Sequence, residues 1–465
     1  MASSSSASVK TSSREATPNA ISEQASRETT PPPSNAPTKS VPTAAVENAP
    51  SDSSKLKTFL SILKRFIGVS DMAAVRFSLP AQLMEPIPNL EYWQYLDRPE
   101  TFVSIPDADD PLGRMLGTLR FWLTKDLKYI KGKPCKPYNS VLSEFFRCNW
   151  EVEEVLPPVL GSANAPTSTT STADNKHPIV VSYLTEQTSH HPPVSAYYVD
   201  CPAKGISARG FDQLSAKFTG TSVRVIPGEH NKGIFITIES RDNEEYQLTH
   251  PAAYLGGFLR GSLYVTVSDT AYICCAKTKI KVILQYMEES WLGRTQNRME
   301  GVVFNYDPSN DKTSKIKDVK DKDVLARIEG CWTDKIYYSL GSTPLNKSTD
   351  KVLLVDVNPL FPVPKIIPPA DEQLPNESPR FWQQVTAAIT EKRYGDATTL
   401  KQQIEQRQRD KTAEREARKA EWRPRFFTEP LAPKGKPELS QEGKDLIKGM
   451  QEGNYHLEES KETGA

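Results

Sequence analysis

The central part of the chain alternates between hydrophobic side chains and other side chains with a period of two residues. Between about residues 135 and 357, short runs of this kind follow one another, such as Ile234, Ile236 and Ile238. Successive side chains of a strand point to opposite faces of a sheet, so the pattern is typical of half-buried strands. Turn-forming residues separate the runs, for example at 307–310. Many short strands in succession predict a large antiparallel sheet, either a sandwich or a barrel, and a barrel with enough strands could enclose an apolar cavity.

A helical spacing of hydrophobic residues precedes the strands. In residues 56–67 the large apolar side chains recur at helical spacing, which predicts an amphipathic helix that Gly68 can end. These side chains are Leu56, Phe59, Leu60, Leu63, Phe66 and Ile67. The rest of the helix surface is mostly basic and polar. Two interpretations stay open: the helix packs on its own core, or its apolar face covers a hydrophobic opening or lies on a membrane.

Helical patterns also occupy residues 80–130 and 370–427. In the first region an Asp-Pro pair at 110–111 offers a capping residue and a proline suited to a first turn, and hydrophobic residues follow at helical spacing. In the second region, residues 381–389 suit a packed amphipathic helix. Residues 398–422 are rich in Lys, Arg, Glu and Gln, which predicts a long solvated helix.

Both ends of the chain have the composition of disordered segments. Residues 1–54 are rich in Ser, Thr, Pro and Ala, and with few large apolar side chains they cannot bury enough surface to offset the entropy of ordering. Residues 431–465 are also expected to be disordered or loosely held. Residues 158–178 are interpreted as a polar surface loop. One folded domain is therefore expected over residues 55–430.

The composition argues against several classes of protein. The 465 residues carry a formal net charge of +0 at pH 7, which argues against nonspecific nucleic-acid binding because that binding requires a basic surface. The sequence has no apolar run of the ~20 residues that a membrane span needs, and no secretory signal pattern. The six cysteines form no C-x-x-C pair and no Cys/His pair has zinc-ligand spacing. We therefore expect reduced thiols in the cytosol and no metal.

The most distinctive stretch is EQTSHHPP at residues 186–193, in which His190 and His191 precede two prolines. A residue before proline is pushed toward extended geometry, so His191 is expected in a stiff, non-helical backbone. Neighbouring residues of an extended chain point to opposite faces, so both imidazoles can meet one ligand only if the strand ends there or wraps around it. Such a pair would suit capture of an anion such as a phosphate. The alternative is a strand end with one histidine exposed and one packed.

Three stretches together resemble the oxysterol-binding-protein family of lipid-transfer proteins. EQTSHHPP is similar to the family signature EQVSHHPP, with Thr188 in place of valine. Residues 136–144 (KPYNSVLSE) resemble the family's KPLNPxLGE segment, with Ser143 in place of glycine. Residues 401–409 (KQQIEQRQR) are similar to its K-x3-E-x2-QR helix. The three matches have the family's order and spacing, and the similarity runs from about residue 56 to 427.

The resemblance implies a mostly β fold with flanking helices, of the α+β class. The expected architecture is a large, nearly closed antiparallel β-barrel with a central lipid tunnel, an N-terminal lid helix and a C-terminal helical region. The lid would span residues 55–79, the helical part 80–130, the barrel 135–357 and the C-terminal helices 370–427. The lid residues expected at the lipid tails are Phe59, Leu60, Leu63, Phe66 and Met72.

The resemblance also implies a binding site for the headgroup of phosphatidylinositol 4-phosphate. Its residues are expected to be Lys136, Asn139, His190, His191, Lys401, Glu405 and Arg409. Lys401, Glu405 and Arg409 share one helix face because they are four residues apart, and Glu405 would position the two cations. Taken alone, these three residues fit a solvated, salt-bridged helix face better. The seven residues lie far apart in sequence, so only the folded rim of a barrel could bring them together.

The function implied by the resemblance is non-enzymatic exchange of a sterol and phosphatidylinositol 4-phosphate, bound in one tunnel, between cytosolic membrane faces. Phosphatidylserine in place of the sterol is one alternative. A sensor that binds the same lipids and recruits partners is a second, and a hydrolase built around Ser189 and His190 is a third. We expect no cofactor, a monomer, and a cytoplasmic protein that associates with membranes peripherally.

Overall fold

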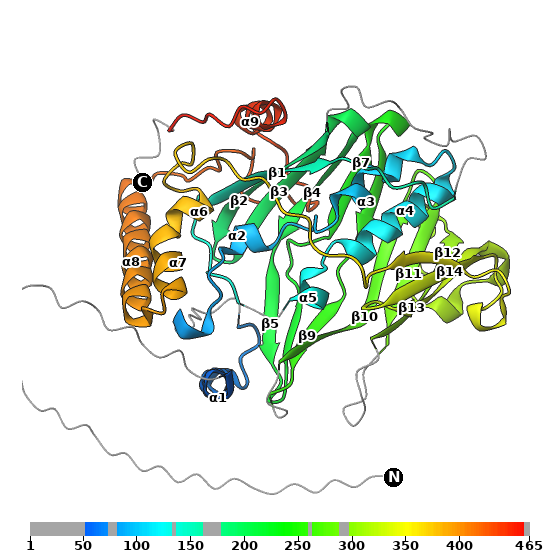
Figure 1. Ribbon diagram of the computed structural model, residues 1–465, viewed down its shortest axis with the longest axis horizontal. Coiled ribbons are helices and arrows are strands. Elements are labelled where there is room, and N and C mark those ends of the chain that lie inside the picture. The colour runs from blue at the N-terminus through cyan, green and yellow to red at the C-terminus, as the bar shows by residue number, and fades with distance from the viewer. Residues whose placement is uncertain are drawn as a thin grey trace, which may run out of the picture. The chain divides into compact units, whose positions relative to one another are not determined.

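The computed structural model describes residues 52–72, 81–132, 136–160, 178–258, 263–287 and 297–459, and everything below concerns these residues. They form one large antiparallel sheet with helices around it (Figure 1). The strands are β1 (Phe145–Val152), β2 (Ile179–His190), β3 (Pro193–Cys201), β4 (Ile206–Asp212), β5 (Leu214–Phe218), β6 (Val223–Pro227), β7 (Ile234–Ile238), β8 (Glu244–Leu248), β9 (Ala252–Gly256), β10 (Tyr264–Cys275), β11 (Ile280–Tyr286), β12 (Arg298–Asn305), β13 (Val324–Cys331), β14 (Lys335–Leu340) and β15 (Val352–Asp356). The α-helices are α1 (Asp52–Leu63), α2 (Asn89–Tyr92), α3 (Pro99–Val103), α4 (Pro111–Thr124), α5 (Lys128–Lys131), α6 (Ser378–Phe381), α7 (Gln383–Thr390), α8 (Tyr394–Arg418) and α9 (Gln441–Gln451).

Strands that follow one another in the sequence pair with each other through most of the sheet. The strand order is β1-β2-β3-β4-β7-β8-β10-β11-β12-β13-β14-β15, and the named strands pair antiparallel. A side branch of β5, β6 and β9 joins this order through the pairing of β9 with β10. β1 and β15 are the two ends of the order, so the described sheet is barrel-like without closing. The predicted large antiparallel sheet with flanking helices is confirmed.

The period-two pattern of the sequence corresponds to burial along the strands. In β13 the alternate residues Val324, Ala326 and Ile328 are buried, and the residues between them are partly exposed. In β11 both faces are buried: Val282 belongs to the main core, and its neighbour Ile283 belongs to a second hydrophobic cluster. A strand covered on both sides loses part of its polar alternation, and in β11 only Gln285 is exposed.

α4 begins where the Asp-Pro pair predicted a helix start. The Asp110 side chain accepts hydrogen bonds from the backbone N–H groups of Leu112 (2.9 Å) and Gly113 (3.0 Å), and Pro111 occupies the first turn. These contacts satisfy N–H groups that have no partner within the helix. From residue 113 to residue 124 every side of the helix is buried. α4 contacts β11 and β15 and belongs to the main hydrophobic core rather than to the surface.

α1 packs its apolar face on the side branch of the sheet. Leu63 and Met72 are buried together with Phe218 and Phe258, and the backbone N–H of Met72 donates to the carbonyl oxygen of Ala216 (2.6 Å). The predicted lid residues that join this cluster are Phe59, Leu60, Leu63, Phe66 and Met72. The apolar face of this helix therefore packs on the protein, and its role as a lid stays a prediction. Residues 73–79 of the predicted lid lie outside the described residues.

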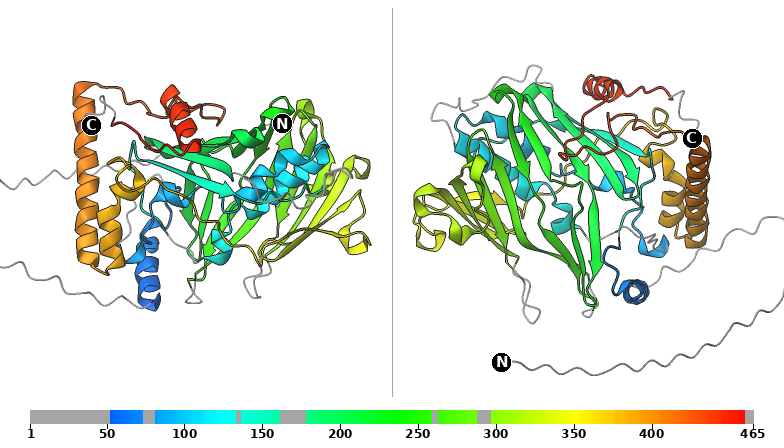
Figure 2. Two further views of the ribbon diagram at one scale, coloured as in Figure 1. Left: turned by 45° about the horizontal axis from the view of Figure 1, so that its top comes forward. Right: turned by 180° about the vertical axis from the view of Figure 1, so that it is seen from behind.

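The C-terminal helices α7 and α8 lie side by side (Figure 2). α8 was expected to be long and solvated, and it runs for 25 residues. Its buried residues are Tyr394, Ala397, Lys401 and Ile404, all in its first half. None of the helices in the described part of the chain combines the length and the apolarity that a membrane crossing requires.

The expectation that residues 431–465 are disordered is wrong for the described residues up to 459. The Ser440 hydroxyl accepts a hydrogen bond from the N–H of Gly443 (3.1 Å) and begins α9. α9 buries Leu446, Ile447 and Met450 in a cluster that also holds residues of β1 and β2. Three apolar residues on one face are too weak a sequence signal to predict packing, because their value depends on the surface they meet. At the other end, α1 begins at Asp52, inside the tail predicted for residues 1–54.

A buried ion pair ties the C-terminal segments to β1. The Arg147 guanidinium contacts both carboxylate oxygens of Glu377, at 3.1 and 3.3 Å, and both side chains are fully buried. The same guanidinium donates to the carbonyl oxygens of Tyr455 (2.8 Å) and Glu372 (3.1 Å). A buried pair of this kind needs such additional hydrogen bonds to offset its desolvation. The residues beyond α9 are therefore held by the strand that begins the sheet.

We predict that Arg147→Met destabilises the protein by about 3–5 kcal/mol, because the substitution leaves the buried Glu377 carboxylate without its cation. Urea unfolding followed by circular dichroism measures the change. The control is Arg423→Met, since the ion pair of Arg423 with Glu421 is exposed on both sides and such pairs contribute roughly 0–1 kcal/mol. Equal stability of the two variants would contradict the role of the buried pair.

Candidate functional site

His190 and His191 stand where β2 ends. A β-bulge precedes them, because the register of β2 against β3 shifts between Gln187 and Ser189, and a bulge re-aims the side chains that follow it. Both imidazoles are exposed, and their rings meet edge to face with centroids 4.7 Å apart. The peptide bond between His191 and Pro192 is cis. The two rings therefore lie together and open to solvent, and the alternative of one exposed and one packed histidine is wrong.

The segment before β1 is fastened to this end of β2. The N–H of Gln187 donates to the carbonyl oxygen of Glu144 (2.8 Å), and the N–H of Ser143 donates to the carbonyl oxygen of Gln187 (3.2 Å). Ser143 has a φ of 66°, in the left-handed region that favours glycine. The pattern to which this segment was compared has glycine here, and the backbone gives a reason for it. In this chain a serine adopts the conformation.

Glu144 joins this segment to the C-terminal helices. Its buried carboxylate accepts hydrogen bonds from the N–H of Val141 (3.0 Å), the hydroxyl of Ser378 (2.6 Å) and the indole N–H of Trp382 (3.1 Å). Burial raises the pKa of Glu144 to about 7, although each of these donors favours the charged form. The carboxylate thus connects two separate parts of the sequence, the segment before β1 and the start of the C-terminal helices.

Lys136 and Lys401 are the two lysines of the predicted site. The Lys136 ammonium donates to the Asn139 side-chain oxygen (2.6 Å), and the Lys401 ammonium pairs with Glu405 (3.0 Å). Burial, together with the charge of Lys401, lowers the pKa of Lys136 to about 8. The positive charge of Lys401 therefore disfavours the charged form of Lys136. Such a pair gains most from a ligand that brings negative charge between them.

Aromatic packing sets the position of α8 against this segment. The Tyr138 ring stacks on Trp382, with centroids 4.8 Å apart and planes 30° apart. Ala397 and Ile404 of α8 belong to the same buried cluster. Lys401 lies between them in the helix and is buried as well, and its charge acts on the pKa of Lys136.

Arg409 lies apart from the other predicted residues. It is exposed, and its guanidinium donates twice to the side-chain oxygen of Gln406 in its own helix (3.0 and 2.7 Å). Eight residues separate it from Lys401, which is about 12 Å along a helix. The structure therefore pairs Lys136 with Asn139 and Lys401 with Glu405, joins the strand that ends in the two histidines to the segment that carries Lys136, and leaves Arg409 on the exposed surface of α8.

Glu186 was not among the predicted site residues, although it begins the EQTSHHPP stretch. Its buried carboxylate accepts hydrogen bonds from the backbone N–H groups of Arg425 and Phe426, each at 2.9 Å. Burial raises the pKa of Glu186 to about 7. A glutamate within a strand of otherwise neutral residues was the only signal of this role, and its partners lie more than 200 residues away.

A buried polar group in the main core also escaped the sequence analysis. The Tyr95 hydroxyl donates to Asp212 (2.6 Å), whose pKa is raised to about 7 by burial. The Tyr95 ring contacts the rings of Tyr197 and His250, with centroid distances of 5.6 and 5.3 Å. The Tyr197 hydroxyl and the Nε2 atom of His250 are buried and find no hydrogen-bond partner among the described residues.

Charged residues surround this polar group. The Lys125 ammonium lies over the rings of Tyr95 and Trp122, 4.7 and 4.5 Å from their centroids, and is paired with Asp126. Burial lowers the pKa of His250 to about 3, and the charge of Lys125 adds to this effect. His250 is therefore neutral at physiological pH, and its Nε2 atom is one of the few uncommitted polar atoms in the core.

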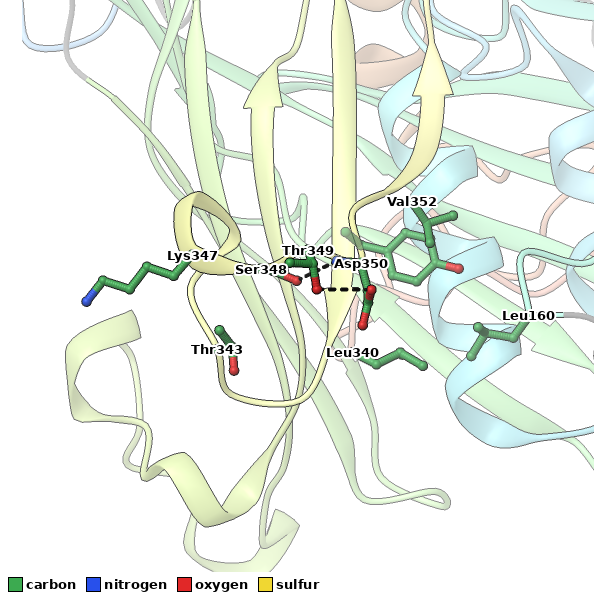
Figure 3. A pocket seen from close by; sticks show the side chains of 9 residues that line it. Leu160, Leu340, Thr343, Lys347, Ser348, Thr349, Asp350 and Val352 are labelled. Carbon is green, nitrogen blue, oxygen red and sulfur yellow. Dashed lines mark hydrogen bonds between the residues drawn. The ribbon is translucent and has the colours of Figure 1, made fainter.

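Two surface pockets lie elsewhere in the described part of the chain. One has a volume of about 510 Å³ and lies between β14 and the residues before β15 (Figure 3); Leu340, Lys347, Asp350 and Val352 are among its lining residues. The other, also of about 510 Å³, is lined by residues that include Tyr92 and Lys128 to Gly132. Neither pocket contains a predicted headgroup residue. Within the described ranges no group of three or more His, Cys, Asp or Glu side chains could hold a metal ion.

Known proteins resemble this chain over most of its length. Residues 58–448 match the family model described as Oxysterol-binding protein. Oxysterol-binding protein-like protein 1 of Schizosaccharomyces pombe is 41% identical over 482 residues, which cover 86% of this chain and 92% of the relative. Oxysterol-binding protein-related protein 9 of Homo sapiens is 29% identical over 366 residues, which cover 77% of this chain and 45% of that protein.

Two solved structures share the fold. The Osh1 ORD domain in complex with ergosterol has a TM-score of 0.60 at 19% sequence identity, and the match covers 84% of this chain and 88% of that chain. The Osh3 ORD of Saccharomyces cerevisiae in complex with PI(4)P has a TM-score of 0.56 at 16% identity, with coverage of 86% and 92%.

We predict that the Glu144 carboxyl makes the free energy of unfolding fall as the pH rises. A carboxyl whose pKa rises from 4.5 to about 7 on folding binds its proton more tightly in the folded state, so its stabilising contribution is full below the lower value and is lost as the pH passes the higher one. Urea unfolding of the wild type and of Glu144→Gln at several pH values between about 5 and 8 should show a smaller decrease in the variant. Glu151→Gln, an exposed position on β1, is the control. Parallel pH profiles for wild type and Glu144→Gln would contradict the prediction.

Proposed function

Because this chain belongs to the oxysterol-binding protein family, we propose that it transfers lipids by binding phosphatidylinositol 4-phosphate and a sterol in turn and exchanging them between cytosolic membrane faces. The observation that carries this proposal is the convergence of the Lys136–Lys401 pair and the two exposed imidazoles on the segment between α5 and β1. The solved relatives agree with both ligands, since one holds ergosterol and another PI(4)P.

The headgroup proposal follows from the charges. A phosphomonoester carries nearly two negative charges and three acceptor oxygens near neutral pH. Lys136 keeps its proton against burial and against the charge of Lys401, so an anion between the two ammonium groups would relieve an unfavourable interaction. We assign Lys136, Lys401, His190 and His191 as ligands of the phosphate and inositol oxygens.

The remaining predicted residues would support these ligands. Asn139 accepts from Lys136 and Glu405 pairs with Lys401, so each holds one ammonium group in place. Arg409 would have to leave Gln406 and swing along α8 to reach the same headgroup. The contacts of Arg409 therefore do not direct it to the headgroup. Its exposure would instead allow it to meet an anionic lipid at the membrane surface.

The buried polar group supports a sterol as the second ligand. A sterol carries one hydroxyl, which can accept a hydrogen bond from the Tyr197 hydroxyl and donate one to the Nε2 atom of neutral His250. Both atoms are buried and have no hydrogen-bond partner within the described ranges, and the surrounding core is apolar and aromatic. Phosphatidylserine would require cationic donors for a carboxylate and a phosphate, but the charges of the nearby ammonium groups of Lys125 and Lys128 are already balanced by Asp97 and Asp126.

The hydrophobic effect underlies both the lid assignment and the transfer step. Each buried methylene group is worth about 0.8 kcal/mol relative to water, so a lipid leaves a bilayer readily only if an equally apolar medium receives it. We propose that α1 and the residues that follow it to Met72 shield the acyl chains and the sterol from water. The sensor alternative uses the same binding site without extraction, and transfer assays separate the two.

One observation disfavours a hydrolase. The Ser189 hydroxyl donates to the carbonyl oxygen of Pro192 (2.7 Å), whereas a serine nucleophile needs its hydroxyl hydrogen bonded to a general base. The neighbouring His190 uses its Nδ1 atom in a contact with Gln187 (3.1 Å). The two residues of the proposed nucleophile and base are therefore engaged with other groups.

We predict that the double variant His190→Ala, His191→Ala extracts at least about tenfold less phosphatidylinositol 4-phosphate than the wild type. Each lost hydrogen bond to a charged group is worth about 1.5–3 kcal/mol. Transfer between donor and acceptor liposomes measures the loss, and sterol binding by the same preparation shows that the fold survives. Ser189→Ala should leave transfer unchanged. Normal extraction by the double variant would remove the histidines from the site, and loss of activity in Ser189→Ala would revive the hydrolase.

We predict that Tyr197→Phe weakens sterol binding by about five- to tenfold, the effect of one neutral hydrogen bond, and leaves phosphatidylinositol 4-phosphate extraction unchanged. Titration with a fluorescent sterol measures the affinity. The matched control is Tyr183→Phe, because the Tyr183 hydroxyl already donates to the carbonyl oxygen of Trp93 (2.8 Å). This variant should lower the midpoint of unfolding, with a smaller effect on sterol affinity than Tyr197→Phe. If Tyr197→Phe impairs phosphatidylserine transfer and not sterol binding, the second ligand is phosphatidylserine.

A further inference from the structure

Gln187 places its side-chain amide between the backbone and His190. The residue is fully buried at the bulge of β2. Its Nε2 atom donates to the carbonyl oxygen of Ser189 (3.0 Å) and lies 3.1 Å from the Nδ1 atom of His190. The two hydrogens of one amide group therefore serve two neighbours.

The chemistry of Ser189 fixes the orientation of this amide. A backbone carbonyl oxygen can only accept, so the group that faces it must be the NH₂ and not the oxygen of Gln187. Turning the amide over would bring two acceptor oxygens together. The Oε1 atom of Gln187 finds no partner among the described residues, which shows that the NH₂ side holds the amide in place.

The tautomer of His190 follows from that orientation. The second hydrogen of the NH₂ points at Nδ1, so Nδ1 has to accept and cannot carry a hydrogen of its own. A neutral imidazole that accepts at Nδ1 carries its hydrogen on Nε2. Adding a proton to Nδ1 would set an N–H against the NH₂ of Gln187.

We propose that Gln187 is a positioning residue that keeps His190 neutral with its hydrogen on Nε2, so that the ring meets an anionic oxygen as an N–H donor. The proposal rests on the headgroup role given to His190 above. It also accounts for the fixed backbone of Gln187, whose N–H and carbonyl oxygen are both held by the segment that carries Glu144 and Ser143.

A neighbouring titratable group acts in the same direction. The ring of His191 packs edge to face on that of His190, with centroids 4.7 Å apart. Positive charge on His191 disfavours a further positive charge on His190. An acceptor facing Nδ1 would be needed to stabilise an imidazolium there, and Gln187 presents a donor.

The deciding measurement is the tautomer of His190 by nuclear magnetic resonance on full-length protein with ¹³C- and ¹⁵N-labelled histidine. His190→Gln identifies the signal by its disappearance. We expect the wild type to carry the hydrogen on Nε2, and Gln187→Glu, which turns the donor into an acceptor, to carry it on Nδ1 and to remain protonated to higher pH. Gln187→Met, which removes both functions, should show a mixture of tautomers.

Thr188→Val is the matched control, because Thr188 is the buried residue at the same bulge and its hydroxyl finds no hydrogen-bond partner among the described residues. Its spectrum should be that of the wild type. A wild-type signal from the Nδ1–H form, or a Gln187→Met spectrum identical to the wild type, would overturn the proposal. Extraction of phosphatidylinositol 4-phosphate from phosphatidylcholine vesicles by the wild type is measured separately, so that a failure of the lipid function leaves the tautomer result standing.

Discussion

The arrangement of the proposed site depends on one buried carboxylate, that of Glu144. Its oxygens hold a backbone N–H of the segment before β1 and two side chains of the C-terminal helices, and its own carbonyl oxygen accepts from Gln187 at the end of β2. Apolar packing alone is not directional, and Glu144 adds hydrogen bonds to those that Tyr138 makes with Thr386 and Ser143 makes with Gln187. Hydrogen bonds fix the relative positions of these segments to a degree that a polar headgroup requires.

The sheet could be predicted from the sequence because half-buried strands alternate in polarity, as β13 does. The start of α4 at Asp110 and the basic face of α1 were also predictable, because capping and amphipathic spacing are local signals. The packing of α9 was not predictable. Three residues, Leu446, Ile447 and Met450, acquire their stabilising role only from the surface of β1 and β2. The buried ion pair was not predictable either, because Arg147 and Glu377 lie 230 residues apart in the sequence.

The candidate site divides in the same way. The resemblance supplied the seven headgroup residues, and six of them form pairs in the structure, Lys136 with Asn139, Lys401 with Glu405 and His190 with His191. No local pattern could reveal that Arg409 bends back on Gln406. The roles of Glu186, Tyr197 and His250 were also beyond the sequence, because a buried polar side chain is recognised only by what surrounds it. Ser143 is a mixed case: the departure from glycine was visible, whereas the positive φ that gives it meaning required the backbone.

A single hairpin connects the two parts of the proposed binding site. β2 ends at His190 on the surface, and its partner strand β3 carries Tyr197 into the core, where Tyr197 pairs with Thr185. Five residues separate Thr185 from His190, which is about 17 Å along a strand. The bulge at Thr188 lies between these two points. It lets the inner part of β2 keep the register that buries its side chains, while the outer part turns its histidines toward solvent. The distance between the phosphate ligands and the buried hydroxyl is thereby set by the sheet itself, and not by loops that could vary it.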